Sequence, residues 1–200
     1  MAKPTAYSVA NKTGLLSEGE VDFLKKLVSY LDPFPIVVII GSGSGTSTLA
    51  VLEQKPDAII FSIDNEFPTT HRYTPGEKQN LIDAGYWDKG NVIQVFGESQ
   101  LIGKHWPIGY DFIFIDGDHR YPYVRDDIRL WLPMAKDKAI VAFHDYGSKE
   151  IKPKAGVKQA VDELIVNNDR VFARELGYER FTKAFILDYA VSTKALDIYE

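Results

Sequence analysis

The stretch IVVIIGSGSG at residues 36–45 joins a run of β-branched side chains to a glycine-rich turn. A continuous β-branched run predicts a strand that is buried on both faces, as strands are in a parallel sheet. Leu49 and Leu52 then recur at helical spacing within residues 46–53, which predicts a helix that packs on that sheet. These residues therefore predict a strand, a turn and a helix, the repeating unit of an α/β fold.

The same alternation continues along the chain. Further strands are predicted at residues 58–63, 91–96, 111–115, 139–143, 171–176 and 183–189. Helices are predicted after Ser17, where Glu20 completes a capping box, between the fourth and fifth strands, and over residues 157–166. Strands that alternate with helices favour a doubly wound parallel sheet, and the helix-free tail favours a closing antiparallel hairpin.

Length and composition indicate an ordinary globular protein. Of the 200 residues, 45% are hydrophobic and 26% are charged, which is enough apolar material for a core. The first residues are small and polar, so we expect a loose N-terminal arm over residues 1–16. The remaining residues, 17–200, are expected to form a single α/β domain.

Charge and residue usage exclude several classes of protein. Lys and Arg number 23 and Asp and Glu number 28, which gives a net charge of −5, so no nucleic-acid partner is expected. The absence of cysteine excludes disulfides, thiolate zinc sites and a cysteine nucleophile. No apolar run is long enough to cross a bilayer, and the polar start is not a signal peptide. We therefore expect a cytoplasmic protein with a small-molecule substrate and no membrane partner, and with no sequence signal for or against an oligomer.

The glycine-rich turn is the first candidate site. In open α/β sheets, ligands bind beyond the carboxyl ends of the strands, and glycines let a ligand approach the backbone. Gly41, Ser42, Gly43 and Gly45 are therefore candidate ligand-binding residues. A P-loop would need a lysine, and the dinucleotide fingerprint would need glycine or alanine where Thr46 stands. The turn predicts either an oxygen-rich ligand at the helix N-terminus or a plain strand–helix turn.

Two later strand ends add further candidates. Asp64 ends the second strand about 20 residues after the glycine turn, where an acid accepts hydrogen bonds from ribose hydroxyls. A solvated loop acid is the alternative interpretation, and Glu66 is the fallback residue. Glu98 and Ser99 follow the third strand, where they either flank a purine or form a plain turn.

The fourth and fifth strand ends carry the densest polar cluster. These residues are Asp116, Asp118, His119, His144 and Asp145. Neighbouring strands lie about 4.8 Å apart, so Asp116, His144 and Asp145 converge if the two strands pair. Such a set holds Mg²⁺ or Mn²⁺, or forms a hydrogen-bonded cluster without a metal. The Asp-Gly-Asp run that begins at Asp116 also resembles the DxD element of nucleotide-sugar transferases.

Taken together, these strand ends resemble those of the class I S-adenosylmethionine-dependent methyltransferases. The likeness is closest to small O-methyltransferases with FIDGDH and FHDY strand ends, which stand here at residues 114–119 and 143–146. It extends over about residues 17–189, which is nearly the whole chain. The resemblance implies a Rossmann-like seven-stranded sheet of order 3-2-1-4-5-7-6, in which the seventh strand is antiparallel.

The resemblance also implies roles for the candidate residues. The implied cofactor-binding residues are Gly41, Ser42, Gly43, Gly45, Asp64, Glu98, Ser99 and Asp116. Among them, the glycines would approach the methionine part of the cofactor and Asp64 would hold the ribose. Glu98 and Ser99 would lie by the adenine.

Three positions depart from the family pattern. Relatives usually carry an acid two residues before the first glycine, where this chain has Ile39. Metal-dependent relatives end the fifth strand in Asp-Asn, where this chain has His144 and Asp145. They also carry a lysine three residues after the fourth-strand acid, where this chain has His119. His119 is therefore the expected catalytic base, because a neutral imidazole accepts a proton near neutral pH, and His144 is the competing candidate.

The expected function is methylation of a hydroxyl oxygen of a small molecule, with S-adenosylmethionine as the methyl donor. Asp116, His144 and Asp145 are expected to hold a divalent cation, Mg²⁺ or Mn²⁺. The alternatives are a metal-dependent nucleotide-sugar transferase that uses Asp116 and Asp118, and a non-catalytic cofactor-binding protein of the same fold. Binding of S-adenosylhomocysteine or of a UDP-sugar separates the first two functions, and a methyl-transfer assay tests the third.

Overall fold

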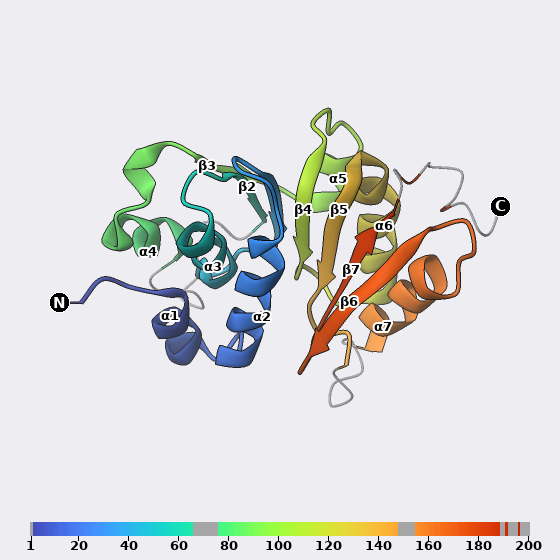
Figure 1. The fold of residues 1–200 in the computed structure, drawn as a ribbon, viewed down its shortest axis with the longest axis horizontal. Coiled ribbons are helices and arrows are strands. Elements are labelled where there is room, and N and C mark those ends of the chain that lie inside the picture. Colours follow the sequence, from blue (N-terminus) through green and yellow to red (C-terminus); the bar gives the residue numbers. More distant parts are fainter. Residues whose placement is uncertain (1, 66–75, 148–154, 189–190, 192–195, 197–200) are drawn as a thin grey trace.

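Seven strands form one mixed sheet in the computed structural model, which describes residues 2–65, 76–147, 155–188, 191 and 196 (Figure 1). The strands are β1 (Ile36–Ile40), β2 (Ile59–Asp64), β3 (Val92–Phe96), β4 (Tyr110–Ile115), β5 (Ala135–Phe143), β6 (Ala173–Glu179) and β7 (Thr182–Leu187). Their order is β3-β2-β1-β4-β5-β7-β6. Strands β1 to β5 run parallel, and β7 is antiparallel to both of its neighbours. The Rossmann-like sheet that the resemblance implies is therefore confirmed.

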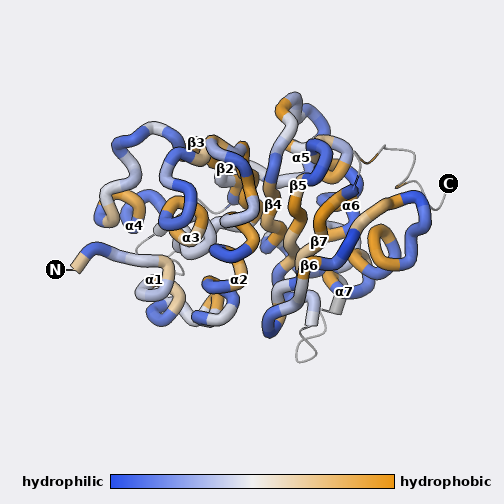
Figure 2. The backbone as a smooth tube through the Cα atoms, in the orientation of Figure 1, coloured by the Kyte–Doolittle hydropathy of each residue, from blue (hydrophilic) through white to orange (hydrophobic). Residues whose placement is uncertain are grey.

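Helices cover both faces of this sheet. They are α1 (Ala6–Thr13), α2 (Glu18–Ser29), α3 (Thr46–Gln54), α4 (Glu77–Ala84), α5 (Ser99–Gly103), α6 (Tyr121–Trp131) and α7 (Ala155–Val161), which continues as a π-helix over Asp162–Val166. Side chains alternate along β1, so Val37 and Ile39 pack with α1 to α3, whereas Val38 and Ile40 pack with α6 and α7. Each such buried side chain contributes about 1.5–3 kcal/mol to folding. Figure 2 shows the hydrophobic strands at the centre of the molecule.

The N-terminal segment differs from the expected loose arm. Thr5 and Ser8 form a capping box that begins α1, and the Ala6 N–H donates to Glu53 Oε1 at 2.8 Å. Val9 and Ala10 are buried in the same cluster as α2 and α3. The small apolar face of this short helix therefore packs against α2 and α3. The local sequence does not show that these two helices cover it.

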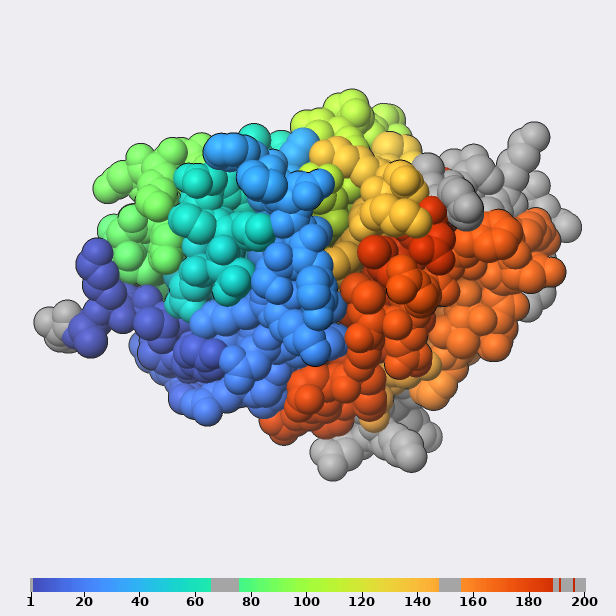
Figure 3. All heavy atoms as spheres, in the orientation of Figure 1, coloured from blue at the N-terminus to red at the C-terminus, as the bar shows by residue number. Residues whose placement is uncertain are grey.

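The β6–β7 hairpin contacts α2 across the sheet edge. Gly177 of β6 lies against Phe23, since an added Cβ would approach the Phe23 ring within 3.1 Å. In the space-filling view of Figure 3, the blue N-terminal helices and the orange hairpin adjoin on one face. Glu20 of α2 also lies 3.2 Å from His144, which directly follows β5, so α2 lies next to the carboxyl end of β5. In the part of the chain that the structure describes, no helix has the length and apolar character needed to cross a membrane.

Candidate active site

A pocket of about 700 Å³ opens at the carboxyl ends of the five parallel strands, β1 to β5. Its volume lies within the range of about 300–1,000 Å³ that small-molecule sites occupy. Of the candidate residues named from the sequence, the pocket is lined by Gly41, Ser42, Gly43, Asp64, Glu98, Ser99, Asp116, Asp118, His119, His144 and Asp145. Gly45 does not line it, and Glu66 lies outside the described residues. The topology therefore gathers residues from five strand ends around one cavity.

Gly41 is required by the packing of β1 against β4. Its φ is +81°, and an added Cβ would lie 2.1 Å from the Asp116 carbonyl oxygen. The Asp116 N–H also donates to the Ile40 carbonyl at 2.9 Å. A side chain at Gly41 would thus push away the chain that carries Asp116, whatever ligand the turn binds.

Asp64 is tied directly to the glycine turn. The Gly43 N–H donates to Asp64 Oδ2 at 2.9 Å, and both residues line the pocket. Thr46, the first residue of α3, is 4% exposed, and its Oγ1 has no hydrogen-bond partner among the described residues. Buried hydroxyls normally have a partner. The turn therefore offers backbone N–H groups and an unused hydroxyl at a helix N-terminus, which suits an oxygen-rich ligand.

A buried acid that was not predicted holds the Ser99 side of the pocket. Asp127 Oδ1 accepts hydrogen bonds from Ser99 Oγ at 2.6 Å and from Gln100 Nε2 at 2.9 Å. Burial raises the pKa of Asp127 to about 7. Its helical spacing of three residues from the inward-facing Val124 is the sequence signal that places it on the buried side of α6.

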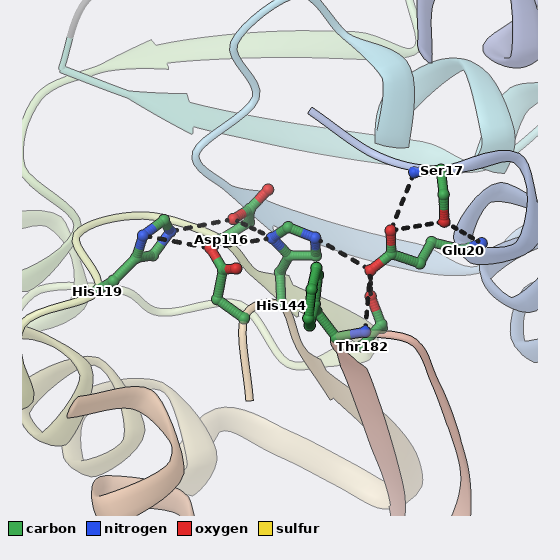
Figure 4. Close-up of polar contacts among 8 residues, drawn as sticks. Ser17, Glu20, Asp116, His119, His144 and Thr182 are labelled. Carbon is green, nitrogen blue, oxygen red and sulfur yellow. Dashed lines mark hydrogen bonds and ion pairs between the residues drawn. The ribbon is translucent and has the colours of Figure 1, made fainter. Parts of the chain in front are cut away.

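His144 lies at the centre of the polar cluster shown in Figure 4. Its Nδ1 is 3.0 Å from Asp116 Oδ1 and 3.4 Å from Asp145 Oδ2. Its Nε2 faces Glu20 Oε1 at 3.2 Å. Burial would lower the pKa of His144, but the three carboxylates around it raise the pKa to about 12. The carboxylates therefore favour the protonated form of His144 as long as no metal is bound to it.

Glu20 supports His144 from α2 and was predicted only as a capping residue. Its Oε2 accepts from the Ser17 N–H and hydroxyl, whereas its Oε1 faces His144 and accepts from Thr182 Oγ1 at 3.2 Å. Burial would raise the pKa of Glu20, but the hydrogen bonds from His144 and Ser17 hold it below its ordinary value. One carboxylate thus caps a helix, binds β7 and orients the imidazole.

His119 lies beside the same two carboxylates. Its Nε2 is 3.3 Å from Asp116 Oδ1, and its Nδ1 is 3.3 Å from Asp145 Oδ2. Its side chain is 26% exposed, whereas that of His144 is 6% exposed. Burial would raise the pKa of Asp116, but the two histidines hold it below its ordinary value. His119 is therefore the histidine that a ligand in the pocket can reach.

The cluster has the donor set of a cation site. Asp116, His144 and Asp145 each offer one ligand atom, and these atoms lie within 4.8 Å of one another. Asp145 has a φ of +58°, which is uncommon for a residue other than glycine and is typical of functional sites. Carboxylate and imidazole donors suit a divalent cation such as Mn²⁺, so the residues present fit the expected metal.

Asp118 takes no part in this cluster. Its carboxylate makes bonds of 3.0 Å to Arg120 Nε, and the Arg120 guanidinium stacks on Tyr123 at 4.3 Å. Arg120 lowers the pKa of Asp118. The contacts of Asp118 are thus those of an ion pair on the pocket wall, which does not favour the DxD interpretation.

Comparison with known proteins identifies the family. A family model described as a methyltransferase domain matches residues 38–146, which is more than half of the chain. The chain belongs to this methyltransferase family. The expectation of a class I S-adenosylmethionine-dependent methyltransferase is confirmed. No curated protein sequence matches this methyltransferase.

Several solved structures share the fold of the methyltransferase. An S-adenosylhomocysteine-bound methyltransferase from Podospora anserina has a TM-score of 0.70 at 14% identity, over 92% of this chain and 88% of that one. An O-methyltransferase from Bacillus cereus in complex with S-adenosylhomocysteine has a TM-score of 0.63 at 19% identity, over 90% and 88%. The O-methyltransferase TomG from Streptomyces achromogenes, in complex with S-adenosylmethionine, has a TM-score of 0.64 at 18% identity, over 91% and 87%. At these identities the likeness shows the common fold.

Proposed function

We propose that this methyltransferase transfers a methyl group to a hydroxyl oxygen of a small molecule. The observation that carries the proposal is that one pocket contains both the Gly43–Asp64 pair and the cluster around His144. The first suits a nucleoside-containing cofactor, and the second suits an acceptor that must lose a proton. Cofactor and acceptor would then meet between β1 and β4.

The cofactor would lie along the carboxyl ends of β1, β2 and β3. Gly41, Ser42 and Gly43 would face its methionine part, and Asp116 would lie beside it. Asp64 would accept hydrogen bonds from the ribose hydroxyls, in addition to the bond from Gly43, and Glu98 and Ser99 would flank the adenine. Gly45 would act indirectly, because it lies outside the pocket lining.

The acceptor would be deprotonated by His119. When bound, S-adenosylmethionine supplies an electrophilic methyl group on a sulfonium sulfur. The protein has to align the acceptor oxygen with that methyl group and remove its proton. Asp145 would hold the proton on Nδ1 of His119, so that Nε2 takes the proton of the acceptor. His144 would not act as the base, because the surrounding carboxylates favour its protonated form and, with a cation bound, its Nδ1 would be a ligand.

A divalent cation would be held by Asp116, His144 and Asp145, and its binding would displace the proton from Nδ1 of His144, because only a neutral imidazole can be a ligand. Bound there, it would lower the pKa of the acceptor hydroxyl and orient its oxygen. Glu20 would then accept the Nε2–H of His144, since metal-bound histidines usually donate their second N–H to a carboxylate or carbonyl. Imidazole ligation favours Mn²⁺ over Mg²⁺, which takes oxygen ligands.

The test is methyl transfer from methyl-labelled S-adenosylmethionine to a panel of phenols, catechols, aliphatic alcohols, thiols and amines, followed by mass spectrometry. We expect label on a hydroxyl oxygen, and loss of transfer in His119→Ala. His105→Ala is the matched control, because His105 is an exposed histidine outside the pocket. Transfer only to thiols or amines, or equal loss in both variants, would contradict the proposal.

A further inference from the structure

The first turn of α4 packs against the glycine turn. The Glu77 N–H donates to the Gly43 carbonyl at 3.3 Å, and Asn80 Nδ2 donates to the Ser44 carbonyl at 2.8 Å. Gly45 has a φ of +80°, and an added Cβ would lie 2.8 Å from Glu77 Cγ. Three consecutive residues of the turn are therefore in contact with one helix.

Glu77 is also the hub of a buried hydrogen-bond network. Glu77 is only 1% exposed. Thr48 Oγ1 of α3 donates to Oε1, and Oε2 accepts from Ser62 Oγ of β2 at 2.7 Å and from Gln94 Nε2 of β3 at 2.8 Å. These partners lie on α3, β2 and β3. The Glu77 side chain therefore links the helix that follows the glycine turn to two strands of the sheet.

The printed partners of the Glu77 carboxyl group within the described residues are all uncharged. Burial raises the pKa of Glu77, although its hydrogen bonds oppose that rise. A neutral carboxylic acid would also satisfy the network: the oxygen on the Oε2 side can accept from Ser62 and Gln94, and the Thr48 hydroxyl can rotate to accept from the carboxyl O–H instead of donating to Oε1. A glutamine would reproduce this pattern with a carbonyl oxygen and an N–H donor.

The strand before the turn, β1, contributes no acidic side chain that could hold the turn. Ile39 stands where relatives carry an acid, and it is 0% exposed within the apolar cluster. We propose that Glu77 and Asn80 are positioning residues for the cofactor, which hold the glycine turn in its binding conformation from α4. The inference rests on the proposed cofactor site and names how this chain builds it.

The first test is the affinity for S-adenosylhomocysteine, measured by calorimetry on the full chain. Glu77→Ala should weaken binding by about tenfold or more, because the turn would populate its binding conformation less and lose the hydrogen bonds that fix it. Glu77→Gln should bind within about twofold of the wild type. Asp83→Ala is the matched control, because Asp83 lies on α4 but is exposed and pairs with Gln79. Wild-type affinity in Glu77→Ala, or equal weakening in Glu77→Gln, would overturn the proposal.

Two further measurements separate positioning from loss of fold. If Glu77→Ala does not fold, Asn80→Ala removes the hydrogen bond to the Ser44 carbonyl and should still weaken binding severalfold. An unchanged affinity in Asn80→Ala would refute the role of α4. Hydrogen exchange of residues 41–46 without ligand should be faster in Glu77→Ala or Asn80→Ala than in Asp83→Ala. Equal exchange in the three variants would overturn the inference about α4. If the wild type bound no S-adenosylhomocysteine, that result would contradict the proposed function, and the exchange measurement would still test the inference.

Discussion

Replacing Asp127 with asparagine tests how the Ser99 side of the pocket is held. Asp127 is fully buried on α6, and its Oδ1 accepts hydrogen bonds from Ser99 and Gln100. Burial raises its pKa from an ordinary value of 3.8 to about 7. The folded protein therefore keeps a proton on this carboxyl group at pH values where the unfolded chain has lost it.

The raised pKa gives stability a pH dependence of known sign. In the unfolded chain the carboxyl ionises near about pH 4, whereas in the folded protein it ionises near about pH 7. The contribution of the protonated Asp127 to the free energy of unfolding is complete below about pH 4. It is lost as the pH rises to about 7, by about 4 kcal/mol in total. Asp127→Asn removes this loss, so the free energy of unfolding of the variant should gain on the wild type as the pH rises.

Urea denaturation at about pH 4 and about pH 8 measures the difference between the two proteins. We expect Asp127→Asn to gain several kcal/mol on the wild type between these conditions. Asp126→Asn is the control, because Asp126 is the neighbouring acid on the same helix, 40% exposed and paired with Arg125. A difference between Asp127→Asn and the wild type that does not change with pH would refute the reasoning.

Four further predictions concern the ligands. Gly43→Val should abolish S-adenosylhomocysteine binding, because it places a branched side chain at a φ of +50° against the ligand. Circular dichroism should show that the variant is folded, and normal affinity would contradict the turn as the cofactor site. Asp64→Ala should weaken the same affinity about ten- to a hundredfold by calorimetry, and a change below about twofold would remove its role. His119→Ala should lower turnover by about 10²–10⁴ without changing cofactor affinity, whereas loss in His144→Ala alone would reverse the two roles. Excess chelator should depress activity and Mn²⁺ should restore it, so full activity in chelator would leave the cluster metal-free.

The positions of the strands could be predicted because local sequence determines them. A strand that is buried on both faces needs a continuous apolar run, and the β1 residues Ile36–Ile40 provide one. Residues that follow such strands lie at one edge of the sheet, which is why Asp64 and Asp116 could be named as site residues. The sheet order came from the family resemblance, since propensity alone does not specify which strands pair.

The supporting residues could not be predicted, because their partners are distant in the sequence. Glu20 contacts Thr182 across 162 positions, and Glu77 contacts Thr48 across 29. In local terms Glu20 is a capping residue and Asp127 is one acid in a charged helix. The burial of Glu20 and Asp127 depends on which elements pack together. The same holds for α1, whose short sequence carries only a weak helical pattern. The burial of Glu20 and Glu77 is therefore recognised only in the folded chain.

A crystal structure of the protein with S-adenosylhomocysteine tests the central claim most directly. We expect one ligand in the pocket at the carboxyl ends of the strands, with its homocysteine part at Gly41–Gly43 and its ribose hydroxyls on Asp64. The sulfur should face the side of the pocket that contains His119. A ligand bound elsewhere, or no bound ligand at saturating concentration, would contradict the account.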